Sequence, residues 1–123
     1  MAATAAAAIS ADSTIAMIET ARGLSALEEI CAVPGLSGVY VGPADLAISL
    51  GENPITALNT PAVLDAVTRI HSVASRAGLV PGIHANAGKP GKAMAQLGFR
   101  MITLASESQA LRRGAAAHLE EAQ

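Results

Sequence analysis

The sequence has 123 residues, 51% of them hydrophobic and only 2% aromatic, so one domain with an aliphatic core is expected. Eight Lys and Arg residues stand against ten Asp and Glu residues, which gives a formal net charge of −2. No basic block interleaved with aromatic residues occurs, which argues against nucleic acid as a partner.

Three further features narrow the class of protein. The first ten residues, MAATAAAAIS, are apolar but contain no Lys or Arg and are mostly alanine, which is untypical of a signal peptide. No apolar run reaches the roughly 18 residues that suggest a membrane span. The single Cys31 can form no internal disulfide and is interpreted as a small buried helix residue. We therefore expect a cytoplasmic protein with no membrane partner.

The first predicted elements are a strand and a helix. Residues 13–18, STIAMI, form a short continuous apolar run, which is typical of a strand buried on both faces. A helical pattern follows from Thr20, and the Pro-Gly pair at 34–35 ends it. Ser25 and Glu28 have the spacing of a capping box within that pattern.

A second strand is predicted at 38–41, and it runs into a short helix in PADLAISL and then a loop. The next helix is the clearest element, with Thr60 as N-cap, Pro61 at the first helical position and Gly78 as terminator. Residues 79–85 then predict a third strand. The apolar stripe expected on the long helix consists of Val63, Val67, Ile70 and Ala74.

The last elements are a short helix in GKAMAQL that Gly98 ends, a fourth strand at 100–105, and an amphipathic helix. This final helix is expected to begin at Ser106 or Ser108 and to run through Leu111, Ala115 and Leu119. Four βα units in succession predict a parallel sheet with right-handed crossovers. Two architectures remain open: a doubly wound open sheet, or part of a (β/α)₈ barrel, which when complete takes roughly 200 to 250 residues.

Two acids, Glu19 and Asp45, each follow an apolar strand and lie one βα repeat apart. In parallel α/β folds the carboxyl ends of neighbouring strands share one edge, so both side chains should face the same site. Two close carboxylates repel each other unless a proton or a cation lies between them. Oxygen ligands favour Mg²⁺ or Mn²⁺, with Co²⁺ as a further candidate. Each acid also fits a helix N-terminus, where the macrodipole stabilises it.

Several segments resemble one enzyme family over about Ile15 to Leu111. The segments are MIET, ALEEICAVPGLSGVYVGPADLAISLG, GIHA and LGFRMITLASE. Together they resemble the carboxyl-terminal half of the HpcH/HpaI aldolases, which are metal-dependent pyruvate aldolases. The resemblance implies the C-terminal half of a (β/α)₈ TIM barrel of the pyruvate/phosphoenolpyruvate type, with four βα units. It implies cleavage of a 4-hydroxy-2-oxo acid to pyruvate and an aldehyde.

The same resemblance implies roles for particular residues. Glu19 and Asp45 match the family's metal ligands, and the metal chelates the keto and carboxylate oxygens of pyruvate. The turn at Gly42, with the backbone N–H groups of Ala44 and Asp45, matches the family's carboxylate-binding turn at a helix N-terminus. Leu104 matches an apolar residue that packs on the substrate. Pyruvate or a related 2-oxo acid is thus the expected small-molecule partner.

The chain departs from the family in two respects. Met17 stands where some members have a Gln that contacts pyruvate, and Met cannot donate a hydrogen bond. The family's catalytic His, its pyruvate-binding Arg and the supporting acid all lie in the first half of the barrel, which has no counterpart here. We therefore interpret residues 1–123 as a partial barrel domain, in which 1–12 is the remnant of a preceding helix or is disordered.

The remaining basic side chains are expected to serve less specific roles. His71 and His118 are expected in solvent. His84 ends the third strand and should lie near the site of Glu19 and Asp45, which makes it a candidate general base, although similar segments in the family do not supply the base. Lys89 and Lys92 are interpreted as solvent-exposed charges or, alternatively, as a weak anion-binding site at the rim of the barrel.

Two other functions compete with the aldolase hypothesis. One is an acyl-thioester lyase like the β subunit of citrate lyase, and the other is a catalytically inactive fragment that binds metal or forms oligomers. A half barrel leaves 13–18 and 100–105 as apolar edge strands without the charges or prolines that usually protect an edge. The chain is therefore expected to form a homo-oligomer or to require a missing N-terminal half.

Overall fold

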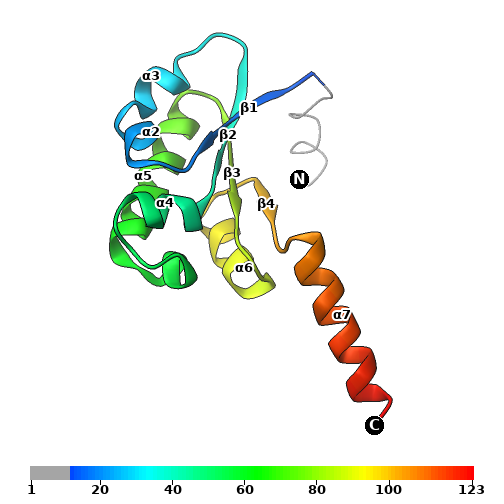
Figure 1. The fold of residues 1–123 in the computed structure, drawn as a ribbon. Helices are drawn as coiled ribbons and strands as arrows, with labels where there is room; N and C mark the ends of the chain where they lie inside the picture. The colour runs from blue at the N-terminus through cyan, green and yellow to red at the C-terminus, as the bar shows by residue number, and fades with distance from the viewer. Residues whose placement is uncertain (1–11) are drawn as a thin grey trace.

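The computed structural model describes residues 12–123, and four strands there form one parallel sheet (Figure 1). The strand order is β1-β2-β3-β4, so each strand lies beside the one that follows it in the chain. A doubly wound sheet reverses its strand order at one point, and no reversal occurs among these four described strands. The expected helix remnant or disorder at 1–12 falls almost entirely outside the described residues. The strands are β1 (Thr14–Ile18), β2 (Leu36–Val41), β3 (Val80–His84) and β4 (Met101–Thr103).

Helices connect the strands, as the sequence predicted. Helix α5 packs against β2 and β3, and α6 packs against β4. The bounds are α2 (Ala21–Ser25), α3 (Leu27–Cys31), α4 (Pro43–Ser49), the 3-10 helix η1 (Pro54–Asn59), α5 (Pro61–Arg76), α6 (Gly88–Leu97) and α7 (Glu107–Glu121).

The two faces of the sheet differ in burial. Alternate residues of a strand point to opposite faces, and on one face Ile18, Val39 and Ile83 are 0 to 1% exposed in the core beneath the helices. On the opposite face Met17 is 56% exposed and Tyr40, its pairing partner on β2, is partly exposed. We call this opposite side the open face of the sheet.

The predicted long helix is confirmed as α5. Thr60 lies at its N-cap position and Pro61 is its first residue, although the Thr60 hydroxyl donates to the Thr56 carbonyl (3.0 Å) and does not cap the helix. Gly78 follows the helix with φ +74°, a conformation that glycine adopts without strain. The predicted apolar stripe is fully buried at Val63, Val67, Ile70 and Ala74.

The first helical segment differs from the prediction because it is divided at Ala26 into α2 and α3. Thr20 caps α2 by accepting a hydrogen bond from the Gly23 N–H at 2.9 Å. The expected capping box at Ser25 was wrong, since the Ser25 hydroxyl donates to the Ala21 carbonyl inside α2. The predicted loop before α5 also contains η1, which Asn53 caps through the Ile55 N–H.

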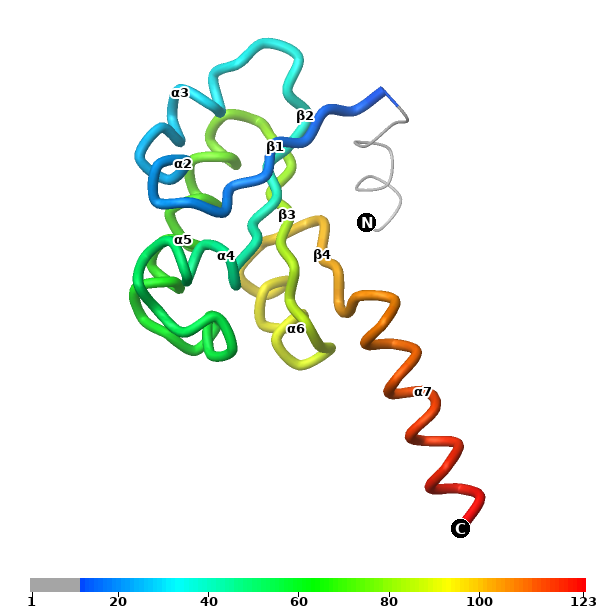
Figure 2. The backbone as a smooth tube through the Cα atoms, viewed as in Figure 1, coloured from blue at the N-terminus to red at the C-terminus, as the bar shows by residue number. Residues whose placement is uncertain are grey.

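The last helix, α7, projects away from the rest of the chain (Figures 1 and 2). It begins after Ser106, whose side chain forms a capping box with Gln109, so the first of the two predicted starts is confirmed. Leu111 and Leu119 are 75% and 66% exposed. The predicted amphipathic helix is therefore present, and its apolar residues face solvent in the single chain.

The structure also tests the environments predicted for Cys31, His118 and His71. Cys31 is buried as predicted, and burial raises the pKa of its thiol, which makes it a poor nucleophile at neutral pH. His118 is exposed as predicted. His71, expected in solvent, is only partly exposed, because its ring packs on Phe99 with the ring centroids 5.2 Å apart. In the described part of the chain, no helix has the length and apolarity needed to cross a membrane.

Candidate functional site

One row of residues lies along the carboxyl ends of the four strands. Glu19 and Gly42 come directly after β1 and β2, and His84 and Thr103 are the last residues of β3 and β4. Each lies two residues beyond one of the paired positions Met17, Tyr40, Gly82 and Met101, so all four belong to the open face. The sheet thus brings Glu19 and His84 to one edge, where Asp45 follows in the first turn of α4.

The carboxylates of Glu19 and Asp45 converge on Gly42. A Cβ atom placed on Gly42 would lie 3.3 Å from Glu19 Oε2 and 3.9 Å from Asp45 Oδ2. The two oxygens are therefore no further apart than these two distances together. Because glycine has no side chain, the space between the two carboxylates stays open. Glu19 and Asp45 thus face one space at the carboxyl ends of β1 and β2.

Hydrogen bonds fix the positions of the backbone segments that carry Glu19 and Asp45. The Gly42 N–H donates to the Ile18 carbonyl at 3.2 Å, which continues the β1–β2 ladder to the point where Glu19 begins. On the other side of Glu19, the Ala21 N–H donates to Ser49 Oγ at 2.8 Å and ties the chain to α4. The segment that carries Glu19 is thus fixed at both ends to the elements that position Asp45.

Among the described residues, no basic side chain forms an ion pair with either of these acids. Within residues 12–123, the ion pairs join Arg69 to Glu28 and His118 to Glu121, and neither includes Glu19 or Asp45. No group of three or more His, Cys, Asp and Glu side chains suitable for a metal ion occurs in that same stretch. A cation bound here would therefore have two protein carboxylates as side-chain ligands, with its other coordination positions open to substrate or water.

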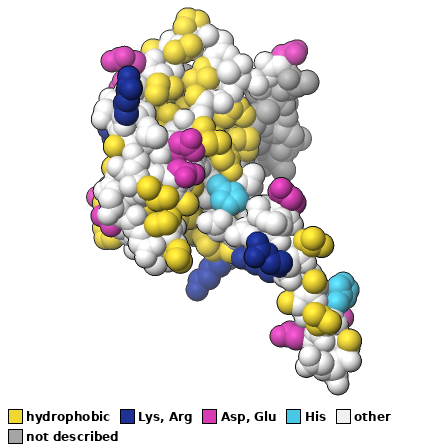
Figure 3. All heavy atoms as spheres, in the orientation of Figure 1, with side chains coloured by type: hydrophobic (Ala, Val, Ile, Leu, Met, Phe, Trp, Pro, Cys, Tyr) yellow, Lys and Arg dark blue, Asp and Glu magenta, His cyan; other side chains and the backbone are white. Residues whose placement is uncertain are grey.

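A cavity of about 190 Å³ surrounds the pair. Figure 3 shows acidic side chains beside a histidine near the middle of the visible face, with hydrophobic side chains around them. Leu104, expected to contact substrate, does not line this cavity, because it lies one residue beyond Thr103 and packs against Gly91 of α6. The lining consists of Met17, Glu19, Tyr40, Gly42, Pro43, Ala44, Asp45 and His84.

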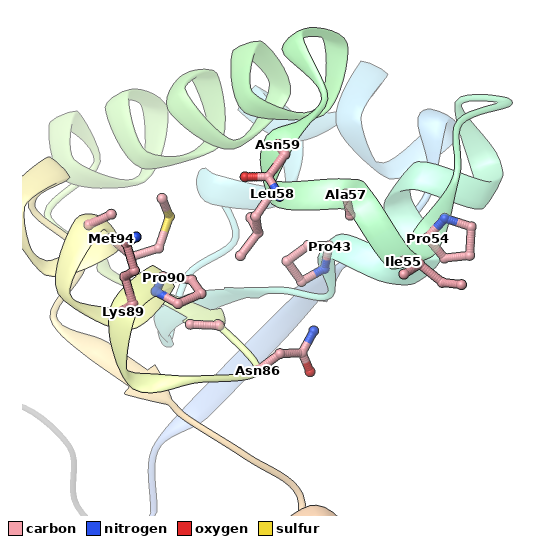
Figure 4. Close-up of a pocket in the computed structure, with 12 residues that line it drawn as sticks. Pro43, Pro54, Ile55, Ala57, Leu58, Asn59, Asn86, Lys89, Pro90 and Met94 are labelled. Carbon is pink, nitrogen blue, oxygen red and sulfur yellow. The ribbon is translucent and has the colours of Figure 1, made fainter.

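A larger cavity of about 450 Å³ lies between α4, η1 and α6 (Figure 4). Its walls are mostly apolar, and Lys89 is the charged residue among them. Lys89 and Lys92 are both exposed, as expected. The carboxylates lie outside this larger cavity, so we place the chemistry in the smaller one.

Three polar residues near the site were not singled out from the sequence. The Tyr40 hydroxyl is hydrogen-bonded to Thr103 Oγ1, which in turn lies 2.7 Å from His84 Nδ1. The opposite ring nitrogen, His84 Nε2, lies 2.6 Å from Asn86 Oδ1. Tyr40 and Thr103 are 63 residues apart in the chain. No local sequence pattern could have joined them, because only the sheet brings them together.

Comparisons with known proteins agree with this geometry. A sequence model of the family described as HpcH/HpaI aldolase/citrate lyase matches residues 7–113. The hydroxypyruvate/pyruvate aldolase of Paraburkholderia phytofirmans is 41% identical over 108 residues, which are 88% of this chain and 41% of the relative. The 4-hydroxy-2-oxo-heptane-1,7-dioate aldolase of Klebsiella pneumoniae is 33% identical over 105 residues, 84% of this chain and 38% of the relative. The chain thus spans about two fifths of the length of these relatives.

A solved structure shows the same likeness in three dimensions. It is an HpcH/HpaI aldolase/citrate lyase family protein from Burkholderia cenocepacia, with 34% sequence identity and a TM-score of 0.83. The superposition covers 89% of this chain and 42% of that one. The parallel sheet and its helices therefore have a counterpart in an experimentally determined member of the family.

Proposed function

This chain belongs to the HpcH/HpaI aldolase/citrate lyase family, and on that premise we propose that it forms the metal- and pyruvate-binding part of a carbon–carbon lyase. The reaction proposed is the reversible cleavage of a 4-hydroxy-2-oxo acid to pyruvate and an aldehyde. The named relatives include aldolases that act on hydroxypyruvate or pyruvate and on a 4-hydroxy-2-oxo acid. Because the chain spans only part of those enzymes, the activity is a proposal for this chain.

One observation carries the proposal: two carboxylates without basic partners in the described residues face the space above Gly42. Bringing two like charges together is unfavourable unless a cation or a shared proton offsets the repulsion. Carboxylate oxygens are the ligands that Mg²⁺ and Mn²⁺ prefer. Glu19 and Asp45 would hold such an ion, which when bound supplies Lewis-acid stabilisation of negative charge on a substrate oxygen.

The remaining walls of the cavity suit a small 2-oxo acid. Gly42, Ala44 and Asp45 lie at the start of α4, where the first backbone N–H groups of a helix have no acceptor within it. These N–H groups would bind the substrate carboxylate. Met17 offers an apolar surface beside them, so it would orient the substrate by contact and not by a hydrogen bond.

We also propose that the sheet is half of a (β/α)₈ barrel. Four parallel strands in sequential order, helices over one face and an open opposite face support this assignment. So does the length of the match, about two fifths of each aldolase relative. In the complete barrel the open face would line the interior, with the carboxylates at its mouth.

Pyruvate binding tests this function against the acyl-thioester alternative. The Mn²⁺-loaded chain should bind pyruvate, and the chelator-treated chain should not, because the proposed site holds the substrate through the ion and the turn at Gly42. Isothermal titration calorimetry with pyruvate and with acetyl-coenzyme A measures both. Acetyl-coenzyme A binding without pyruvate binding would favour the citrate-lyase type, and binding of neither would favour an inactive fragment.

A further inference from the structure

We propose that Tyr40, Thr103 and His84 form a proton relay that opens on the cavity of Glu19 and Asp45, and that Tyr40 is the residue that exchanges the proton with substrate. This inference rests on the proposed function, because the substrate is taken to be a 2-oxo acid in that cavity. It adds a proton-transferring group to a site whose carboxylates are assigned to metal binding.

The relay is continuous in space. The Tyr40 hydroxyl is hydrogen-bonded to Thr103 Oγ1, Thr103 Oγ1 lies 2.7 Å from His84 Nδ1, and His84 Nε2 lies 2.6 Å from Asn86 Oδ1. The side chains come from β2, β3 and β4 and from the residue two beyond His84. All three contacts are hydrogen bonds, so a proton can pass along the row by small shifts.

Asn86 sets the direction of the relay. Its carbonyl oxygen Oδ1 can only accept, so His84 Nε2 carries a proton in both charge states of the imidazole. When His84 is neutral, Nδ1 must accept from Thr103 and Thr103 must accept from Tyr40. When His84 is cationic, Nδ1 donates to Thr103 and Thr103 donates to Tyr40. In this second state the Tyr40 O–H is free to point into the cavity.

The transfer that follows conserves atoms and charge. The Tyr40 O–H bond breaks as its proton bonds to the nucleophilic C3 carbon of the enolate form of the 2-oxo acid. The Tyr40 oxygen takes the Thr103 proton, and Thr103 Oγ1 takes the proton from His84 Nδ1. The imidazolium becomes a neutral imidazole with its proton on Nε2. The reverse sequence removes a proton from the methyl group of pyruvate and stores it on His84.

Tyr40, and not His84, faces the substrate. Both residues line the cavity, but Thr103 and Asn86 occupy the two ring nitrogens of His84. The Tyr40 oxygen has one partner there and retains hydrogen-bonding capacity for a substrate atom. Tyr40 is therefore the catalytic residue, and Thr103, His84 and Asn86 act through it.

Two backbone features support the arrangement. A Cβ atom on Gly82 would lie 3.1 Å from Tyr40 Cδ2 and 2.6 Å from Met101 Cε, so glycine at this position leaves room for the ring to cross β3 toward β4. Asn86 has φ 64°, the left-handed region that asparagine tolerates better than most residues. Arg113 donates to the Asn86 carbonyl at 3.3 Å and helps to hold this turn.

The ionisable groups around His84 come from several elements. Glu19, Asp45 and Tyr40 share its cavity, and Arg113 of α7 binds the backbone carbonyl of Asn86. Variants that test the relay must therefore leave Glu19, Asp45 and Arg113 unchanged. The changes Tyr40→Phe, His84→Gln and Thr103→Val do so.

Exchange of the pyruvate methyl protons in D₂O tests the relay directly. With the Mg²⁺-loaded chain and pyruvate, ¹H NMR should show exchange that Tyr40→Phe, His84→Gln and Thr103→Val each slow by about 10²-fold or more, the usual contribution of a positioned acid or base. Thr103→Ser retains the hydroxyl and should retain the rate. His71→Gln is the matched control, because that ring packs on Phe99 away from the cavity.

Two outcomes of the exchange experiment would overturn the relay: an unchanged rate in Tyr40→Phe, or a wild-type rate no higher than that of Mg²⁺ alone. Mg²⁺ affinity, measured in parallel, should be equal in wild type and Tyr40→Phe. If wild type binds no Mg²⁺, the proposed function fails as well, and if it binds Mg²⁺ without exchange, only the relay fails. Independently of activity, ¹H–¹⁵N NMR of neutral His84 should show the proton on Nε2, and a proton on Nδ1 would also overturn the proposal.

Discussion

Replacing Glu19 by Gln, or Asp45 by Asn, should weaken Mn²⁺ binding at least about tenfold, because each change removes one of two charged ligands from a hard cation. Gln and Asn have nearly the same shape as the acids they replace, so packing around Gly42 should be preserved. The double variant should bind no Mn²⁺ at concentrations that saturate wild type. Isothermal titration calorimetry with MnCl₂ measures all three.

The matched control is Asp65→Asn, which removes one negative charge from an exposed position on α5. It should leave Mn²⁺ affinity unchanged, because Asp65 does not line the cavity of Glu19 and Asp45 and its exposed charge is screened by salt. If Asp65→Asn weakened Mn²⁺ binding as much as Glu19→Gln did, the affinity would depend on the net charge of the chain and not on a specific site. Unchanged affinity in both site variants would contradict the assignment of Glu19 and Asp45.

We expect single chains to associate with one another in solution. The single chain leaves β1 and β4 as sheet edges, Met17 exposed on the open face, and Leu111 and Leu119 exposed on α7. Edge strands with unpaired backbone groups and exposed apolar patches promote pairing between chains. Light scattering at micromolar concentration should therefore give a mass well above the 12.3 kDa of one chain.

A charge on the open face should oppose this association. Ile15 pairs with Gly38 on the β1 edge, and Ile15→Lys should shift the chain toward the monomer, because burying an unpaired charge is costly. Gln96→Lys adds the same charge to an exposed position of α6 and should not change the mass. A wild-type monomer that unfolds cooperatively would show that the sheet is self-sufficient and would contradict the half barrel.

Local patterns predicted most of the fold. A short apolar run identifies a buried strand without knowledge of its neighbours, and all four predicted strands are present, with ends that differ by one or two residues. The convergence of Glu19 and Asp45 was also predictable, because parallel strands always place their carboxyl ends at one edge. Both arguments need only spacing along the chain.

The errors arose where a distant partner, or a competing local partner, decides the outcome. Ser25 and Glu28 have capping-box spacing, but Thr20 caps the helix earlier and Ser25 bonds back to the Ala21 carbonyl. His71 lies on an amphipathic helix, and its contact with Phe99 depends on how α5 meets the segment before β4. Contacts of this kind are set by packing and have no local sequence signature.

Paramagnetic broadening by Mn²⁺ shows which residues lie closest to the bound ion. Substoichiometric Mn²⁺ added to the ¹⁵N-labelled chain broadens amide NMR signals of residues close to the ion. We expect the signals of Glu19, Gly42 and Ala44 to disappear first and the signal of Asp65 to keep its intensity. Broadening centred on the acids of α7, or spread evenly over the chain, would contradict a metal site between Glu19 and Asp45.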